Sequence, residues 1–145
     1  MELSCKTEYA LLALLELAIR YNEGEPLQIR QIAAQQNIPD RYLEQLLATL
    51  RRSGLVRSQR GAKGGYLLAR EPRKITLFDI VSCLDGLDAQ ESEQETARAT
   101  LENAVIGDIW REVRQAVNLV LQQHTLQDLC DKRDARRQLD IMYYI

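Results

Sequence analysis

The first stretch of the chain is rich in hydrophobic residues. Between Leu3 and Tyr21 apolar side chains occupy most of the circumference of a helix, and Gly24 and Pro26 follow as stop signals. A helix on the surface of a domain needs only one apolar stripe. The pattern therefore predicts a helix that is buried on several sides.

Two shorter segments with helical spacing come next. The first contains Ile29, Ile32 and Ala33 and ends at Asn37. The second opens with Pro39 and Asp40, which suit a first helical turn, and stops before Gly54. Its apolar stripe consists of Tyr42, Leu43, Leu46, Leu47 and Leu50. Two short helices joined at residues 37–39 predict a helix-turn-helix.

The pattern then becomes typical of strands. The stretches "LVRSQR" and "YLLAR" flank "GAKGG", which predicts a β-hairpin closed by a glycine turn. Thr76 and Asp79 have the spacing of a capping box, so a helix is expected from there through Leu84, with Gly86 closing it. Helix, short helix, helix and hairpin, in that order, is the winged helix-turn-helix arrangement.

The last third of the chain combines a polar segment with an unusually apolar helix. Residues 88–103 are acidic and predict an exposed loop or a frayed helix start. Beyond them two apolar stripes run side by side, formed by Val105, Ile109, Val113, Ala116 and Val120 and by Ile106, Trp110, Val117 and Leu121. So wide a surface on one helix predicts burial against a second copy of the chain. We expect Val105, Ile109, Val113, Val117 and Val120 to form that dimer interface.

Another capping pattern, Thr125 to Asp128, predicts a final short helix before the charged tail "DKRDARRQLD". Together these elements predict a mainly α fold with a hairpin wing. Three regions are expected: a winged helix-turn-helix domain at residues 1–86, an acidic loop at 87–103, and dimerisation and C-terminal helices at 104–145.

Composition narrows the class of protein. The chain has 145 residues, of which 46% are hydrophobic and 28% charged, and no apolar run is long enough to span a membrane. Acidic residues interrupt and precede "YALLALLELAI", so the charge pattern of a signal peptide is missing. Cys5, Cys83 and Cys130 are far apart and odd in number. These features predict a cytoplasmic protein in a reducing compartment.

Charge is distributed unevenly. The net charge is −2, yet eight Lys or Arg residues lie between Arg51 and Lys74 with Glu71 as the single acid. Such a cluster of positive charge is typical of a surface that binds a polyanion. The commoner explanation of consecutive charged residues is a surface that is only exposed to solvent.

The glycines of "RGAKGGYLLAR" allow three interpretations. A nucleotide-binding loop is disfavoured because strand-forming residues follow it and no Lys-Ser or Lys-Thr pair is present. A tight hairpin that binds nothing is the simplest alternative. The position directly after a helix-turn-helix favours the third, a basic wing that lies along DNA phosphates with an Arg in the minor groove.

The sequence contains few residues that could catalyse a reaction or bind a metal. His124 is the only histidine, and only Asp128 follows it at ligand spacing. No Ser or Cys pairs with it as a nucleophile and base would, so we expect no enzyme and no metal site. Cys83 is expected in the core. Whether Cys5, Cys83 or Cys130 acts as a redox switch or cluster ligand stays open.

Three stretches closely resemble the iron–sulfur cluster regulator (IscR-like) family of bacterial transcription factors: "LSCKTEYALLALLELA", "IAAQQNIPDRYLEQLLATLRRSGLVRSQRGAKGGYLLAR" and "ITLFDIVSCLDG". The resemblance implies a homodimer that binds double-stranded promoter DNA, with the long helix crossing its symmetry mate. It implies that Arg41 and Glu44 face the major groove and that Arg60 enters the minor groove. Helical spacing places Gln45 beside them, and Arg51 and Lys63 complete the expected DNA-binding set.

One departure from the family concerns its cofactor. Cluster-binding members carry three cysteines in the loop before the long helix, and residues 87–108 here contain none. A histidine often found three residues before the tryptophan is replaced by Gly107. We therefore expect a dimeric repressor without the usual iron–sulfur cluster, responding to a protein or small-molecule effector or to none. The alternative is a protein-interaction module that regulates a metabolic enzyme.

Overall fold

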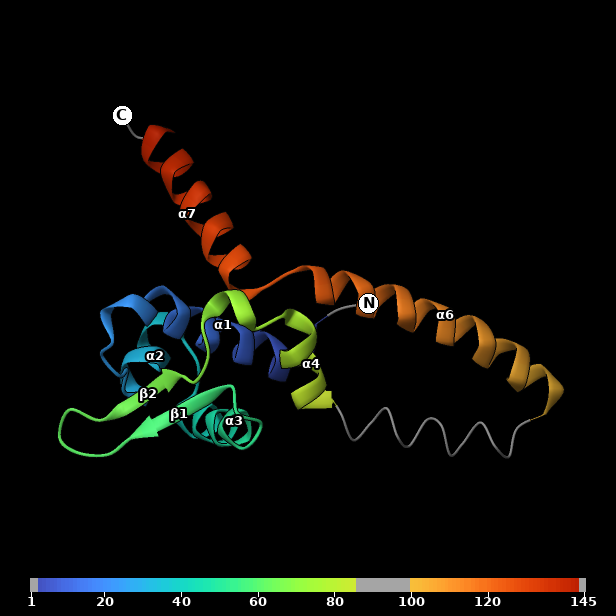
Figure 1. Ribbon diagram of the computed structural model, residues 1–145, viewed down its shortest axis with the longest axis horizontal. Coiled ribbons are helices and arrows are strands. Elements are labelled where there is room, and N and C mark those ends of the chain that lie inside the picture. Colours follow the sequence, from blue (N-terminus) through green and yellow to red (C-terminus); the bar gives the residue numbers. More distant parts are fainter. Residues whose placement is uncertain (1–2, 86–99, 144–145) are drawn as a thin grey trace.

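The computed structural model describes residues 3–85 and 100–143 (Figure 1). In chain order its elements are α1 (Cys5–Ile19), the 3-10 turn η1 (Tyr21–Glu23), α2 (Ile29–Gln36), α3 (Asp40–Arg52), β1 (Val56–Gln59), β2 (Gly65–Leu68), η2 (Pro72–Lys74), α4 (Leu77–Asp85), α6 (Leu101–Gln123) and α7 (Leu126–Tyr143). This is the expected mainly α fold with one antiparallel hairpin. Within the described part, no helix has the length and apolar character needed to cross a membrane.

Helix α1 is the centre of the core. It packs against α2, α3, α4, β2 and α7, and Ala10, Ala13 and Leu14 are fully buried. Small residues on α1 let these neighbours approach closely, which confirms the predicted burial on several sides. The helix is shorter than Leu3 to Tyr21, because Ser4 caps its start and the chain changes to the 3-10 turn η1 after Arg20.

Helices α2 and α3 form the predicted helix-turn-helix. Asn37 ends α2 in a left-handed conformation with a φ of 55°, which asparagine adopts more readily than most residues. Pro39 is the N-cap of α3, and Leu43, Leu46, Leu47 and Leu50 of that helix are buried. Gly54, with a φ of 79°, follows the end of α3. The turn chemistry and the apolar stripe are thus as the sequence indicated.

The hairpin is extended by a third segment. Strands β1 and β2 pair antiparallel from Val56–Leu68 to Gln59–Gly65. Leu27, just before α2, pairs with Tyr66 of β2 through a bridge of two backbone hydrogen bonds. The base of the wing is therefore attached to the helix-turn-helix on both sides, since β1 also packs against α3.

Two matching capping boxes meet where α4 and α7 begin. The side chains and backbone N–H groups of Thr76 and Asp79 bond reciprocally, and Thr125 and Asp128 do the same. Both boxes were predicted. Thr76 and Thr125 also form an antiparallel bridge, so the start of α7 is fixed to the start of α4.

In the C-terminal third, the helices begin and end at other residues than the sequence pattern suggested. Residues 86–99, including Gly86 and most of the expected acidic loop, lie outside the described residues. The last residues of the segment expected to be an exposed loop or a frayed helix start belong to the helix, because Thr100 caps α6 and the helix begins at Leu101. The final helix is not short: α7 continues through the charged tail to Tyr143. Alternating acids and bases along that tail support an exposed helix.

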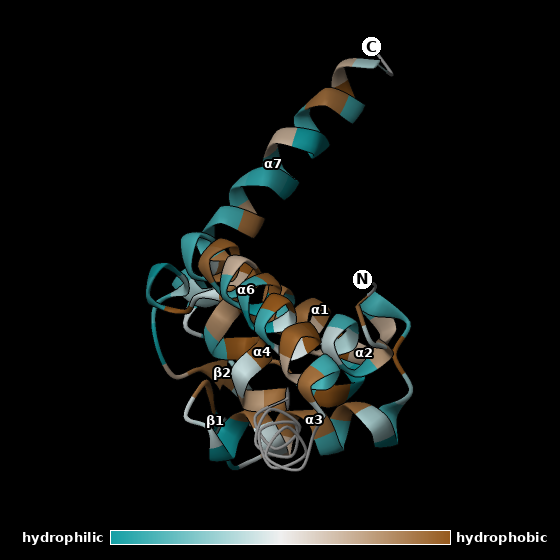
Figure 2. Ribbon diagram, turned by 90° about the vertical axis from the view of Figure 1, so that its right-hand side faces the viewer, coloured by the Kyte–Doolittle hydropathy of each residue, from teal (hydrophilic) through white to brown (hydrophobic). Residues whose placement is uncertain are grey.

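Helix α6 lies apart from the core and projects to one side (Figure 1). None of its residues is buried, although hydrophobic residues run along it (Figure 2). Ile109 is 55% exposed and Trp110 is 62% exposed. By contrast, Leu126 and Cys130 at the start of α7 belong to the same core as α1. A single chain thus leaves its longest apolar surface uncovered.

Candidate nucleic-acid interface

The outward face of α3 carries three of the predicted DNA-contacting residues. Arg41, Glu44 and Gln45 are all exposed, while the leucines of the same helix face the core. The hydrophobic pattern alone therefore decides which side chains α3 presents to solvent. These side chains carry a guanidinium, a carboxylate and an amide. Together they can form hydrogen bonds with the donors and acceptors on the edges of DNA bases.

The end of α3 is tied to the wing. An Nη of Arg51 donates a 3.4 Å hydrogen bond to Oγ of Ser58 on β1. Arg52, one residue later, donates to Oγ1 of Thr49. Arg51 remains exposed, so its guanidinium can hold the helix against the wing and still face a phosphate.

The glycine loop is a compact turn at the tip of the hairpin. The N–H of Gly64 donates to the carbonyl of Gly61, and Gly61 has a φ of 117°. A side chain at Gly64 would overlap the carbonyl oxygen of Gln59, so only glycine fits there. Because β2 and not a helix follows, the turn lacks the helix N-terminus that a nucleotide-binding loop requires. Arg60 and Lys63 are exposed in this turn.

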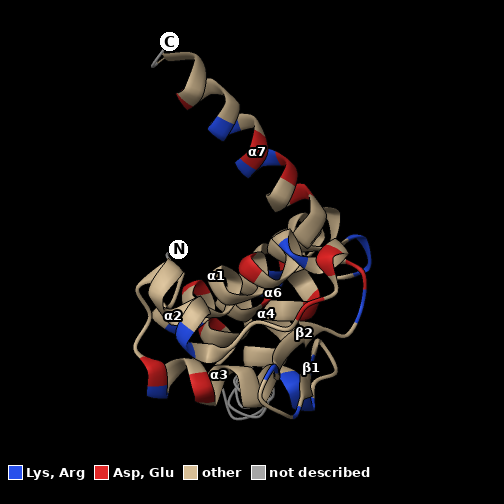
Figure 3. Ribbon diagram, turned by 90° about the vertical axis from the view of Figure 1, so that its left-hand side faces the viewer, with Lys and Arg blue, Asp and Glu red and all other residues tan. Residues whose placement is uncertain are grey.

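Exposed basic residues lie at the end of α3, along the wing and in the segment that follows β2. All eight cations between Arg51 and Lys74 are exposed. The ion pairs found among the described residues lie elsewhere, on α6 and α7. Figure 3 shows α3, with acidic and basic residues, and the hairpin, with basic residues, along the same edge of the molecule. Unneutralised cations on a protruding hairpin beside an exposed helix suit a nucleic-acid backbone.

The three thiols lie on three different helices, α1, α4 and α7. Cys5 is exposed at the start of α1 and Cys130 is buried on α7. Cys83 on α4 is half-buried rather than a full core residue, and its Sγ contacts Oγ of Ser53 and the carbonyl of Thr49. In residues 3–85 and 100–143, no group of three His, Cys, Asp or Glu is arranged to hold a metal ion.

An iron–sulfur cluster needs about four ligands, mostly thiolates, that converge on one point. Burial, and then the charges of Asp134 and Asp131, raise the pKa of the Cys130 thiol, which disfavours the thiolate that ligates iron. Residues 87–108 also contain no cysteine. The side chains present therefore do not fit the iron–sulfur cluster that cluster-binding IscR-like proteins hold.

Two connections at this surface were not foreseen from the sequence. The Leu27–Tyr66 bridge joins segments that no local pattern relates, and the contact of Arg51 with Ser58 depends on how α3 packs on β1. One sequence signal was available for the first: Leu27 directly precedes the N-cap residue Gln28, and the chain that enters a helix at its N-cap is typically extended.

Comparison with known proteins agrees with this geometry. The family model Rrf2, described as an iron-dependent transcriptional regulator, matches residues 3–132. The chain is 38% identical to the HTH-type transcriptional regulator CymR of Bacillus subtilis over 149 aligned residues that cover all of both chains.

Solved structures show the same fold. The IscR structure from T. potens has a TM-score of 0.77 at 36% identity and covers 92% of this chain and 88% of its own. The structure of CymR, titled the global cysteine regulator of B. subtilis, has a TM-score of 0.73 at 37% identity, covering 91% and 98%. The predicted resemblance to IscR-like proteins is confirmed, and the matching proteins are regulators and not enzymes. The chain therefore belongs to the Rrf2 family and is a DNA-binding transcriptional regulator.

Proposed function

We propose that this regulator binds promoter DNA as a homodimer and acts as a repressor by occupying its operator. The observation that carries the proposal is the shared edge of α3 and the hairpin, where the outward face of α3 lies beside the exposed basic residues of the wing. In this arrangement α3 enters the major groove of a half-site, and Arg41, Glu44 and Gln45 meet base edges.

The wing provides the backbone contacts. Arg60 at the base of the turn enters the minor groove, and Lys63 at its tip serves as a point charge near a phosphate. Arg51 contacts the backbone from the end of α3, where its bond to Ser58 limits its movement.

In this proposal the exposed apolar surface of α6 is the dimer interface. Val105, Ile109 and Val120 are more than half exposed, and Val113 and Val117 belong to the same apolar surface. Pairing with the same face of a second copy removes this surface from water and produces a two-fold symmetric molecule. Its two heads would reach half-sites about 10 bp apart or a multiple of that distance. A repressor of this kind works in the cytoplasm, where the promoter is.

The test is binding to genomic fragments selected by the protein, measured against salt. A regulator that neutralises six or more phosphates should lose roughly a thousandfold in affinity between about 50 and about 200 mM salt. It should also prefer its selected fragments over random DNA. Absence of both the salt dependence and the sequence preference would contradict the DNA-reading role and favour a protein-interaction module that regulates a metabolic enzyme.

A further inference from the structure

Glu16 is the one charged residue that is buried in the described part of the chain. It lies on α1 and is 9% exposed, and Thr7 is the other buried residue with a polar side chain there. Nε2 of Gln36, at the end of α2, donates a hydrogen bond to Oε1 of Glu16. Burying a carboxylate is costly unless hydrogen bonds compensate for the lost water. This cost favours arrangements in which Gln36 stays close to α1.

Gln36 stands directly before the turn of the helix-turn-helix. It is the last residue of α2, and Asn37 and Ile38 both donate their backbone N–H groups to the carbonyl of Ala33. Pro39 is already the N-cap of α3, and its ring restricts its φ. The connection between the two helices is therefore short and hydrogen-bonded. A displacement of Gln36 is passed on to the first turn of α3.

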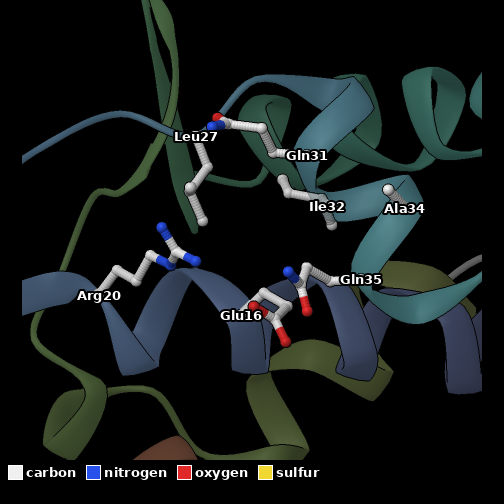
Figure 4. Close-up of a pocket in the computed structure, with 7 residues that line it drawn as sticks. All are labelled: Glu16, Arg20, Leu27, Gln31, Ile32, Ala34 and Gln35. Atoms are coloured by element: carbon white, nitrogen blue, oxygen red, sulfur yellow. The ribbon is translucent and has the colours of Figure 1, made fainter.

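Apolar packing alone leaves the end of α2 loosely fixed. The helix has eight residues, of which Ile32 and Ala33 are buried. A cavity of about 250 Å³ lies between α1 and α2, with Leu27 and Ile32 on its wall (Figure 4). The two helices therefore do not interlock along their whole contact. Burial of apolar surface has no preferred direction, whereas a hydrogen bond depends on distance and angle. The bond to Glu16 fixes what the apolar contacts leave free.

The first turn of α3 carries Arg41, whose side chain is exposed. The leucines of α3 hold its inner face against the core, but an apolar stripe tolerates small shifts along the helix axis. A hydrogen bond to a base edge tolerates much less, because it weakens steeply as distance and angle depart from their optimum. We propose that Glu16 is a positioning residue for DNA reading, which holds the first turn of α3 in place through Gln36. This role rests on the base contacts proposed above for α3.

Amide hydrogen exchange tests the positioning without DNA. In the full chain, Gln36→Met removes the donor and Glu16→Met removes the acceptor, and methionine keeps an unbranched side chain that suits a helix. Relative to the amides of α1, the N–H groups of Asn37 and Ile38 should exchange about tenfold faster in both variants. Gln35→Met is the matched control, because it makes the same change one residue earlier, at an exposed position. Native exchange at Asn37 and Ile38 in Gln36→Met would contradict the proposal even if Glu16→Met failed to fold.

An exchange of the two side chains tests whether the bond itself matters. Glu16→Gln combined with Gln36→Glu places the amide on α1 and the carboxylate on α2, so the hydrogen bond can form in the opposite direction. The combined variant should exchange within about threefold of the native protein at Asn37 and Ile38. Exchange as fast as in Gln36→Met would show that the residues act separately and would overturn the proposal.

Fluorescence anisotropy measures the effect on DNA reading, with a selected operator fragment and a random duplex of equal length. Gln36→Met should raise the operator Kd about tenfold and change the Kd for the random duplex less than about twofold, since phosphate contacts carry no sequence information. In an Arg41→Ala background Gln36→Met should add less than about twofold, whereas in a Lys63→Ala background it should still cost about tenfold. Equal effects in the two backgrounds would indicate a merely structural role.

The two proposals fail in different ways. If the native protein shows no preference for any selected fragment, the role proposed for α3 is wrong, and the positioning role is wrong with it. If the native protein shows the preference and Gln36→Met keeps it in full, only the role of Glu16 is wrong.

Discussion

Leu27 and Tyr66 exchange two backbone hydrogen bonds, of 3.0 and 2.8 Å, and thereby join the segment before α2 to the second strand of the wing. The hairpin is consequently not an independent appendage. Its base is fixed to the helix-turn-helix at Leu27 on one side and at the end of α3 on the other. A substitution at the Leu27–Tyr66 bridge, or of Ser58 beside the end of α3, should alter DNA binding without removing a side chain that is proposed to contact DNA.

Gly65→Ala tests the Leu27 attachment. A methyl group at Gly65 would overlap the carbonyl oxygen of Leu27, and this oxygen belongs to backbone that cannot rotate away. We expect a loss of about 1–3 kcal/mol in the free energy of unfolding and a weaker operator affinity. Urea unfolding and anisotropy titrations measure the two effects.

Gly24→Ala is the control for that variant. Gly24 has a φ of 69° and open space around it, so alanine there costs about 1–2 kcal/mol through backbone strain alone. It should lower stability to a similar degree but leave operator affinity intact. Equal affinity of both variants would show that the Leu27 bridge does not position the wing.

Arg60→Ala and Glu44→Ala should have different effects on DNA binding. Loss of Arg60 removes a backbone and minor-groove contact, so affinity should fall for all sequences and the salt slope should flatten by about one unit. Loss of Glu44 should change which bases are preferred, by about 1–3 kcal/mol per base contact. Lys63→Ala should be milder than Arg60→Ala. Salt-dependent titrations against a randomised operator library measure both effects, and unchanged affinity for Arg60→Ala would rule out the wing model.

Ile109→Glu should disrupt the dimer. Ile109 is exposed in one chain, so the substitution is harmless to a monomer, but in a paired α6 it buries an unpaired carboxylate at a cost of several kcal/mol. Analytical ultracentrifugation should show monomers or aggregated protein. Gln115→Glu adds the same charge to the opposite, polar side of α6 and should leave a dimer. An intact dimer for Ile109→Glu would refute the interface.

The purified protein should hold no iron–sulfur cluster of the kind found in cluster-binding IscR-like proteins. Cys5, Cys83 and Cys130 lie on α1, α4 and α7, and residues 87–108 supply no thiol. Anaerobic purification after expression with ample iron should give colourless protein that still binds its operator. Brown protein with stoichiometric iron and sulfide would show that ligands converge between two chains.

Thiol reactivity should separate Cys5 from Cys130. Burial first, then Asp134 and Asp131, raise the pKa of the Cys130 thiol, so the folded protein keeps it neutral. The neutral Cys130 thiol contributes fully to the free energy of unfolding below the pKa of the thiol in the unfolded chain. This contribution is lost as the pH rises through the higher pKa of the folded protein. At about pH 7, iodoacetamide should modify exposed Cys5 quickly and Cys130 slowly, as peptide mass spectrometry can show. Equal rates in the native protein would contradict the burial of Cys130.

Local patterns of residues were sufficient to predict most helices and strands and the side chains that α3 and the wing expose. Helical periodicity separated the buried leucines of α3 from Arg41 and Glu44, and the spacing of Thr76 and Asp79 marked the start of α4. These features depend on residues within one or two turns of each other, which is why the pattern alone was sufficient. The length of α7 escaped prediction because its charged tail has no apolar stripe to indicate a helix.

Contacts between segments that are distant in the chain could not be predicted in this way. The pairing of Leu27 with Tyr66, the junction of Thr76 with Thr125 and the hydrogen bond from Gln36 to Glu16 all arise from packing around α1. The hydrophobic pattern of a segment does not predict such contacts, because the pattern is the same whichever distant segment it packs against. The choice among these arrangements comes from burying one common apolar core, which only the folded chain possesses.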